Sequence, residues 1–199
     1  MQKLRFLLGI LFIVLLNPLQ AEIQSLIVRW NPTYCSTACA MNLQMQFSRV
    51  FSASKVEFNA QAGEAVLYWK PYAVFTYQQI AAAMNMVGYR AYDIRLRVRG
   101  TISHDRTNFY LTSIGDNTVF TLMSPANSVS NQMSTPYYNQ SSPYASYYNI
   151  PNQQAVQDLR NQLLLGEQSG QLVVIEGPLY EPWRYINMNL VIEQMQFVQ

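Results

Sequence analysis

The sequence is poor in the residues that catalysis draws on. Only 12% of its residues are charged, and its single histidine, His104, stands beside Asp105 in a predicted hairpin turn. The spacing of Ser113, Asp116 and Glu176 matches no catalytic motif, and the chain has no glycine-rich loop for phosphate. We therefore expect a protein that is not an enzyme.

Cysteine is also scarce. The chain has two cysteines, Cys35 and Cys39, which are too few for the disulfide framework of a small secreted domain. The two residues therefore form either a single disulfide or a single functional site.

A membrane-spanning run is missing as well. The apolar run from Phe6 to Leu16 is shorter than the roughly 20 residues that a spanning helix needs, and no later segment comes closer. Two basic residues precede this run, and Ala21 offers a small residue for cleavage, which is the pattern of a signal peptide. We expect residues 1–21 to be removed from an exported protein, periplasmic or secreted, that is not integral to the membrane after cleavage.

The mature chain has no excess of either charge. Loss of Lys3 and Arg5 with the signal peptide lowers the 13 basic residues to 11, against 11 acidic residues. A neutral protein lacks the broad basic field that neutralises phosphates, so we expect no nucleic-acid partner. It also lacks the polybasic segment of a membrane-surface binder.

The first part of the mature chain, residues 22–93, alternates between strand and helix patterns. Thr76 is a natural N-cap for the second helix, Gln79 completes a capping box, and Gly88 ends the helix. In chain order the patterns predict a strand at 25–30, a helix at 40–50, strands at 55–59 and 65–69, a helix at 76–88, and then a further strand. This βαββαβ order predicts a ferredoxin-like domain.

The second part, residues 94–199, is richer in strand patterns. Gly177 and Pro178 are expected to end its fourth strand. The patterns predict strands at 94–102, 108–114, 118–123, 172–176 and 188–192, with a helix at 154–165. Five strands with a helix after the third predict a small barrel of the oligonucleotide/oligosaccharide-binding (OB) type, so the chain is of the α+β class. No linker separates the two predicted domains.

One insertion, residues 124–152, fits neither domain. Serine, asparagine, glutamine, proline and tyrosine dominate it, and it has almost no charge. Such a composition is typical of an irregular surface loop. The alternative is an adhesive arm, because tyrosines give a large contact area at a low entropic cost.

The cysteines lie in the connection from the first predicted strand to the first helix. The N–H groups of a helix N-terminus favour the thiolate form, and two thiolates close together suit an ion such as Cu(I), Hg(II) or Zn(II). Three segments resemble the heavy-metal-associated domain, a family that includes copper chaperones and metal-ATPase N-terminal modules. They are the run from Asn31 to Ala40, the strand pair with Glu64-Ala65-Val66, and the run from Ile80 to Gly88-Tyr89.

The resemblance spans residues 25–93. It implies that Cys35 and Cys39 bind Cu(I) or another soft transition-metal ion, and that Tyr89 lies near them. Met41 lies off the apolar arc of the first helix and is a second candidate neighbour, with packing against the second domain as the alternative.

The sequence departs from the family motif Met-x-Cys-x-x-Cys at two points. Thr33 stands two residues before Cys35, and three residues rather than two separate Cys35 from Cys39. The alternatives to a metal site are a disulfide and an inert pair of small hydrophobic residues. A disulfide requires Cys35 to lie in the loop, because residues four apart in a helix have Cβ atoms about 5–6 Å apart, whereas a disulfide needs about 3.5–4.5 Å.

Three functions therefore stay open. The first is carriage or sequestration of a metal ion through the Cys-x3-Cys pair. The second is a non-catalytic structural or interaction protein of the cell envelope that keeps the metal-domain fold as a scaffold. In this case the barrel, the stripe of Arg95, Arg97 and Arg99, and the Tyr-rich loop bind a protein or glycan partner. The third is a thiol-disulfide redox module.

Overall fold

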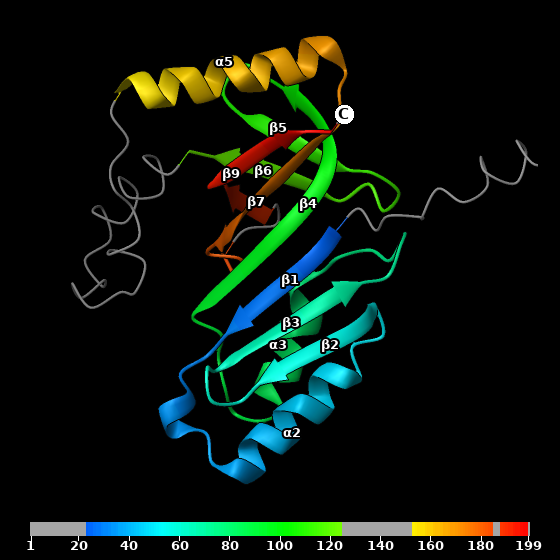
Figure 1. The fold of residues 1–199 in the computed structure, drawn as a ribbon, viewed down its shortest axis with the longest axis vertical. Helices are drawn as coiled ribbons and strands as arrows, with labels where there is room; N and C mark the ends of the chain where they lie inside the picture. The colour runs from blue at the N-terminus through cyan, green and yellow to red at the C-terminus, as the bar shows by residue number, and fades with distance from the viewer. Residues whose placement is uncertain (1–22, 125–152, 185–187, 199) are drawn as a thin grey trace, which may run out of the picture.

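The computed structural model describes residues 23–124, 153–184 and 188–198. The predicted signal peptide, and the Tyr-rich insertion beyond residue 124, lie outside these ranges. The first half contains β1 (Ile23–Arg29), the 3-10 turn η1 (Pro32–Tyr34), α2 (Thr37–Ser48), β2 (Ala53–Asn59), β3 (Glu64–Trp69) and α3 (Tyr77–Asn85). The rest contains β4 (Asp93–His104), β5 (Phe109–Ser113), β6 (Val119–Met123), α5 (Gln153–Ser169), β7 (Val173–Tyr180), β8 (Met188–Val191) and β9 (Gln194–Phe197) (Figure 1).

The first half is a sheet of antiparallel strands with two helices packed against it. The strand order is β2-β3-β1-β4, and each neighbouring pair in this part is antiparallel. Helices α2 and α3 contact each other and bury Leu43, Phe47, Ile80 and Met84 in the core. The predicted order of helices and strands is therefore present. Each helix buries one face, as apolar residues at helical spacing require.

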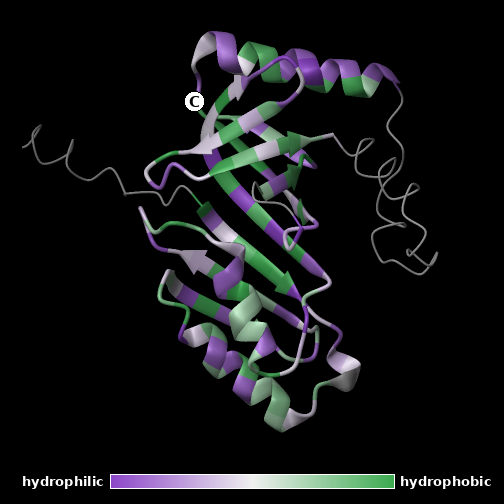
Figure 2. Cartoon of the chain, turned by 180° about the vertical axis from the view of Figure 1, so that it is seen from behind, coloured by the Kyte–Doolittle hydropathy of each residue, from purple (hydrophilic) through white to green (hydrophobic). Residues whose placement is uncertain are grey.

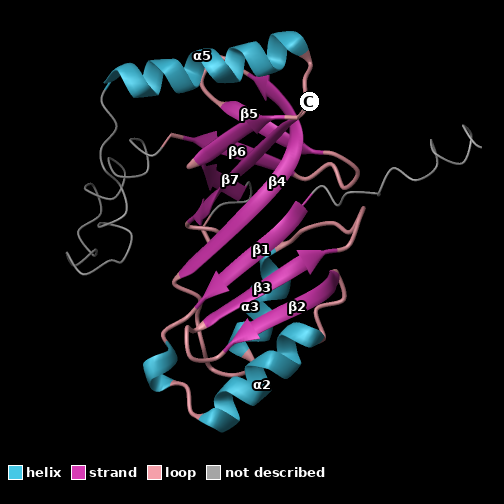
Figure 3. Ribbon diagram, in the orientation of Figure 1, coloured by secondary structure: helices cyan, strands magenta, loops and turns pink. Residues whose placement is uncertain are grey.

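The second half is a closed barrel of five strands. Strand β4 pairs with β5, β5 with β6, β6 with β8, β8 with β7, and β7 again with β4. The β6–β8 pair is parallel and the other pairs are antiparallel. Helix α5 follows β6 in the described chain and lies across one end of the barrel (Figure 3). This architecture confirms the α+β class and fits the predicted barrel.

Strand β4 belongs to both halves. Its first part pairs with β1, from Asp93 opposite Arg29 to Val98 opposite Ile23, while its second part, from Gly100 to His104, pairs with β5. Hydrophobic and hydrophilic residues alternate along β4, as predicted for a strand with one buried face (Figure 2). All nine strands therefore form one sheet, and the predicted boundary between the domains falls at the start of a strand that both use.

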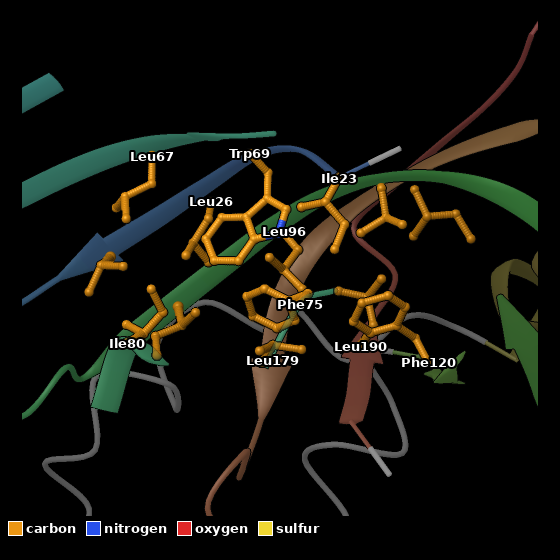
Figure 4. Close-up of a cluster of buried hydrophobic side chains, with 14 of the residues drawn as sticks. Ile23, Leu26, Leu67, Trp69, Phe75, Ile80, Leu96, Phe120, Leu179 and Leu190 are labelled. Atoms are coloured by element: carbon orange, nitrogen blue, oxygen red, sulfur yellow. The ribbon is translucent and has the colours of Figure 1, made fainter. Parts of the chain in front are cut away.

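The hydrophobic core also runs through both halves (Figure 4). The ring of Phe75, which follows β3, lies 5.3 Å from that of Trp69 and 6.4 Å from that of Phe120 in the barrel. The backbone N–H of Phe75 also donates to the carboxylate of Asp116. Phe75 is 2% exposed, so it joins the two halves through a desolvated contact.

Strand β7 corrects one prediction. Gly177 and Pro178 do not end the strand, which continues to Tyr180. Up to Glu176 the outer neighbour of β7 is β9, and from Leu179 it is β8. Pro178 thus lies where one neighbour replaces the other, at a place that tolerates the missing N–H.

Gly177 has its own reason to lie in this strand. A Cβ atom there would meet the carbonyl oxygen of Val191 at 1.8 Å, so only glycine allows the connection from β8 to β9 to cross so closely. The predicted strand at 188–192 also ends earlier, and β9 follows as a separate strand that the sequence reading missed.

Two local predictions for α3 had different outcomes. Thr76 occupies the N-cap position, but its side chain makes no capping hydrogen bond, so the capping box was wrong. Gly88 has φ of 76° and follows the end of the helix, where it turns the chain toward β4 as expected.

Candidate functional site

The connection from β1 to α2 is shaped by short-range signals in the sequence. The side chain of Asn31 accepts a hydrogen bond from the N–H of Thr33. Pro32 starts the 3-10 turn, and its carbonyl accepts a hydrogen bond from the N–H of Cys35. Ser36 then caps α2, because its hydroxyl accepts the N–H of Cys39 at 3.3 Å. The two cysteines therefore lie on either side of a helix cap.

Cys35 and Cys39 form a disulfide, with their Cα atoms 5.3 Å apart. Cys35 lies in the loop before the cap and Cys39 lies in the first turn of α2, which is the placement that a disulfide was expected to require. Both residues are partly exposed, so the bond is accessible to reductants in solvent. In this form neither sulfur is a thiolate, and a metal ion would need the bond to be reduced first.

The predicted neighbours of the cysteines are on α2 and after α3. Met41 is 66% exposed on α2. It follows Cys39 by two positions, which is a rotation of about 200° around the helix axis, so the two side chains do not share a face of the helix. The exposure also shows that Met41 does not pack against the barrel. Tyr89 follows α3, where its N–H donates to the carbonyl of Met84, and its side chain lines a cavity described below.

The strand ends beside the cysteine loop are held by charge pairs. Arg29 donates to Glu64 at 2.8 Å and to Asp93 at 3.0 Å. Partial burial lowers the pKa of Arg29, but the hydrogen bonds and charges of the two carboxylates outweigh it and raise the pKa overall. The N–H of Tyr92 donates to the carbonyl of Arg29, which fixes the approach to β4 against the end of β1. The cysteine loop therefore leaves a rigid strand end.

The basic stripe on β4 is largely neutralised within the sheet. Arg95 pairs with Glu193, and Arg97 pairs with Glu176 at 3.1 Å. Both carboxylates lie on or beside strands of the barrel. The stripe therefore contributes to barrel cohesion, and the sequence reading did not foresee these partners because they lie far along the chain.

His104 is also engaged within the fold. Its Nδ1 lies 2.5 Å from the carboxylate of Glu167 on α5, which also accepts the backbone N–H of His104 at 3.0 Å. The ring stacks on Phe109, with centroids 5.4 Å apart. These contacts hold α5 against the end of β4.

A cavity of about 420 Å³ lies between the two halves of the chain. The pKa of Tyr77 in its wall is raised by burial, an effect that the positive charge of Arg90 partly opposes. Sequence reasoning missed this cavity, although a tryptophan in a Pro-Trp-Arg turn was a signal that could have pointed to it. Its lining consists of Tyr77, Ile80, Ala81, Met84, Asn85, Tyr89, Arg90, Ala91, Ile94 and Trp183.

Two features of the described residues bear on the kind of site. In the part of the chain that the structure describes, no three or more His, Cys, Asp and Glu side chains gather as a metal-binding group. No helix in residues 23–124, 153–184 and 188–198 combines the length and hydrophobicity needed to span a membrane.

Comparison with known proteins gives no relative. No family model, no curated protein and no solved structure matches the chain.

Proposed function

We propose that the protein is an exported carrier or sequestering protein for a soft transition-metal ion, which it binds through reduced Cys35 and Cys39. The observation that carries this proposal is the meeting of the two sulfurs at the N-terminus of α2. The three-residue spacing does not hold the cysteines apart, so two thiolates formed there lie within reach of one ion.

The surroundings of the cysteines favour their thiolate forms after reduction. The first N–H groups of α2 point toward the loop, and the positive end of the helix dipole stabilises negative charge there. Because Cys35 and Cys39 are partly exposed, an ion can enter from solvent. An external dithiol reduces the disulfide and is itself oxidised to a disulfide, which leaves two thiols at this site. The two thiols release two protons when they bind an ion as thiolates.

The number of ligands selects the ion. Structural zinc sites use four protein ligands, whereas the described residues place two sulfurs here and no group of three or more metal-binding side chains. Two thiolates suit a soft ion of low coordination number, so we propose Cu(I) as the ion.

The topology of the first half supports a family assignment within this proposal. The described chain from β1 to β4 has the element order βαββαβ and the strand order β2-β3-β1-β4. We propose that this part is a ferredoxin-like domain related to the heavy-metal-associated domain. The element order of the closed barrel likewise supports an OB-type second domain.

The test is a Cu(I) titration of the full mature protein under anaerobic conditions, with a chromogenic chelator as competitor. We expect about one equivalent for the reduced protein and none for the disulfide form, as a two-thiolate site requires. Cys35→Ser and Cys39→Ser should each abolish tight binding, whereas the control Met41→Leu should retain it. Tight binding in the double cysteine variant, or none in the reduced wild type, would refute the proposal.

A further inference from the structure

The cavity between α3 and Trp183 has walls from both halves of the chain. Helix α3 supplies Tyr77 and Met84, the connection to β4 supplies Tyr89 and Arg90, and the connection from β7 to β8 supplies Trp183. Its volume of about 420 Å³ falls within the range of about 300–1,000 Å³ that is typical of small-molecule sites. The site does not include the cysteines, so it is independent of metal binding.

Trp183 lies in a turn that contacts between Glu181 and Arg184 close. The N–H of Arg184 donates to the carbonyl of Glu181 at 2.9 Å, and their side chains form a salt bridge at 3.1 Å. Glu181 has φ of 42°, a left-handed conformation that is uncommon for residues other than glycine. Pro182 is buried, yet Trp183 remains 57% exposed. The backbone is therefore fixed in a costly conformation that leaves a large aromatic ring at the mouth of the cavity.

The lining is aromatic and apolar with a single charge. Three rings, those of Tyr77, Tyr89 and Trp183, surround apolar side chains such as Ile80, and no carboxylate contributes. Arg90 is the one charged residue of the lining, and it is exposed. Aromatic faces bind planar or apolar bodies, and a guanidinium binds carboxylate or phosphate oxygens through paired hydrogen bonds.

Arg90 differs from the arginines of the neighbouring strand. Arg95 and Arg97 are paired with carboxylates, whereas Arg90 has no ion pair or hydrogen-bond acceptor among the described residues. Its guanidinium is therefore available to a ligand. Because the lining has no acidic residue, an anionic ligand meets no like charge there.

We propose that this cavity binds a small molecule with a planar aromatic body and one anionic group. The body packs against Trp183 and the tyrosines, and the anionic group pairs with Arg90. Neither the cysteine pair nor a metal ion takes part. The site gives the protein a second ligand, with contacts from both halves of the chain.

The experiment uses two probes that differ in charge, 2-naphthoate and its neutral counterpart 2-naphthamide, titrated into the disulfide form of the full mature protein by calorimetry. We expect naphthoate to bind with a dissociation constant below about 1 mM, and more tightly than naphthamide. Arg90→Gln should weaken naphthoate binding about tenfold and leave naphthamide within about twofold. Trp183→Ala should weaken both about tenfold.

Two controls keep the result specific. Arg106→Gln removes an exposed arginine that does not line the cavity, and it should change neither affinity. Circular dichroism should show that all variants fold, as expected for exposed side chains. Failure of the wild type to bind naphthoate would overturn the proposal. Equal loss of both probes in Arg90→Gln, or unchanged affinities in Trp183→Ala, would overturn it as well.

Discussion

Cys35 and Cys39 are linked across the N-cap of α2, with Ser36 between them as the capping residue. The sequence separation of the two cysteines is only 4, so the disulfide closes a short loop. Beyond this loop, the helix is held by Leu43 and Phe47, which are fully buried. The packing of α2 in the core therefore does not depend on the disulfide.

The first prediction concerns the disulfide itself. We expect its reduction to lower the free energy of unfolding by no more than about 2 kcal/mol, because a short loop restricts the unfolded chain only slightly. Urea unfolding with and without reductant measures this difference, and the Cys35→Ser/Cys39→Ser variant should match the reduced protein. Loss of cooperative unfolding on reduction would contradict the prediction.

The second prediction concerns the aromatic contact between the two halves. Phe75→Ala should lower the free energy of unfolding by about 3–5 kcal/mol, since it removes a buried ring that packs on Trp69 and Phe120. The unfolding should remain a single transition, because the sheet and core are continuous. The neighbouring Val74→Ala is the control, with an effect within about 0.5 kcal/mol, since Val74 is 56% exposed. Two separate transitions in the wild type would argue against one cooperative unit.

The third prediction concerns the close crossing at Gly177. Gly177→Ala should cost about 3 kcal/mol, because its new Cβ would overlap the carbonyl oxygen of Val191 and backbone cannot move aside as a side chain can. Gly166→Ala is the matched control. Its Cβ would meet the Phe197 ring at 3.4 Å, and alanine in α5 should stabilise the helix by up to about 1 kcal/mol. Thermal unfolding of both variants distinguishes them, and equal effects would contradict the geometry.

The fourth prediction concerns pH and the turn between β4 and β5. The hydrogen bond from the Tyr110 hydroxyl to Asp105, followed by those from the N–H groups of Asn108 and Thr107, lowers the pKa of the Asp105 carboxyl far below its usual range. A lowered pKa in the folded state gives stability that is present above the unfolded pKa of about 3.9. That stability is lost as the pH falls toward the folded pKa.

The measurement is the melting temperature of wild type and Asp105→Asn as a function of pH. We expect the wild type to be the more stable at pH 7, and the gap to shrink as the pH falls below about 4. Asp158→Asn on α5 is the control, because Asp158 is exposed and no described residue donates a hydrogen bond to it. A gap for Asp105→Asn that stays constant down to pH 2 would contradict the prediction.

Local patterns were sufficient to predict most of the fold. Alternation along β4 and helical spacing in α3 each leave one buried face, so the sequence alone indicates these elements. The pattern failed at Gly177 and Pro178, because their tolerance depends on which strands lie beside β7. Such a change of neighbouring strand is set by the tertiary fold and leaves no pattern in the local sequence.

The candidate sites could be predicted only in part. The two cysteines stood out by scarcity, but their pairing depended on whether Cys35 lay outside the helix, which is decided by the cap at Ser36. The cavity was missed because Trp183 comes from a distant part of the chain to line it with Tyr77 and Arg90, and the Pro-Trp-Arg turn alone does not indicate which residues lie opposite. Spacing along the sequence carries no information on such an approach.

X-ray absorption at the copper edge tests the central claim most directly. The reduced mature protein, loaded with one equivalent of Cu(I), should show two sulfur ligands from Cys35 and Cys39 and no first-shell nitrogen, since a two-thiolate site has no other donor. The same spectrum should be absent from protein that was loaded in its disulfide form. Copper bound through nitrogen or oxygen ligands, or a sulfur signal that persists in the Cys35→Ser/Cys39→Ser variant, would contradict the claim.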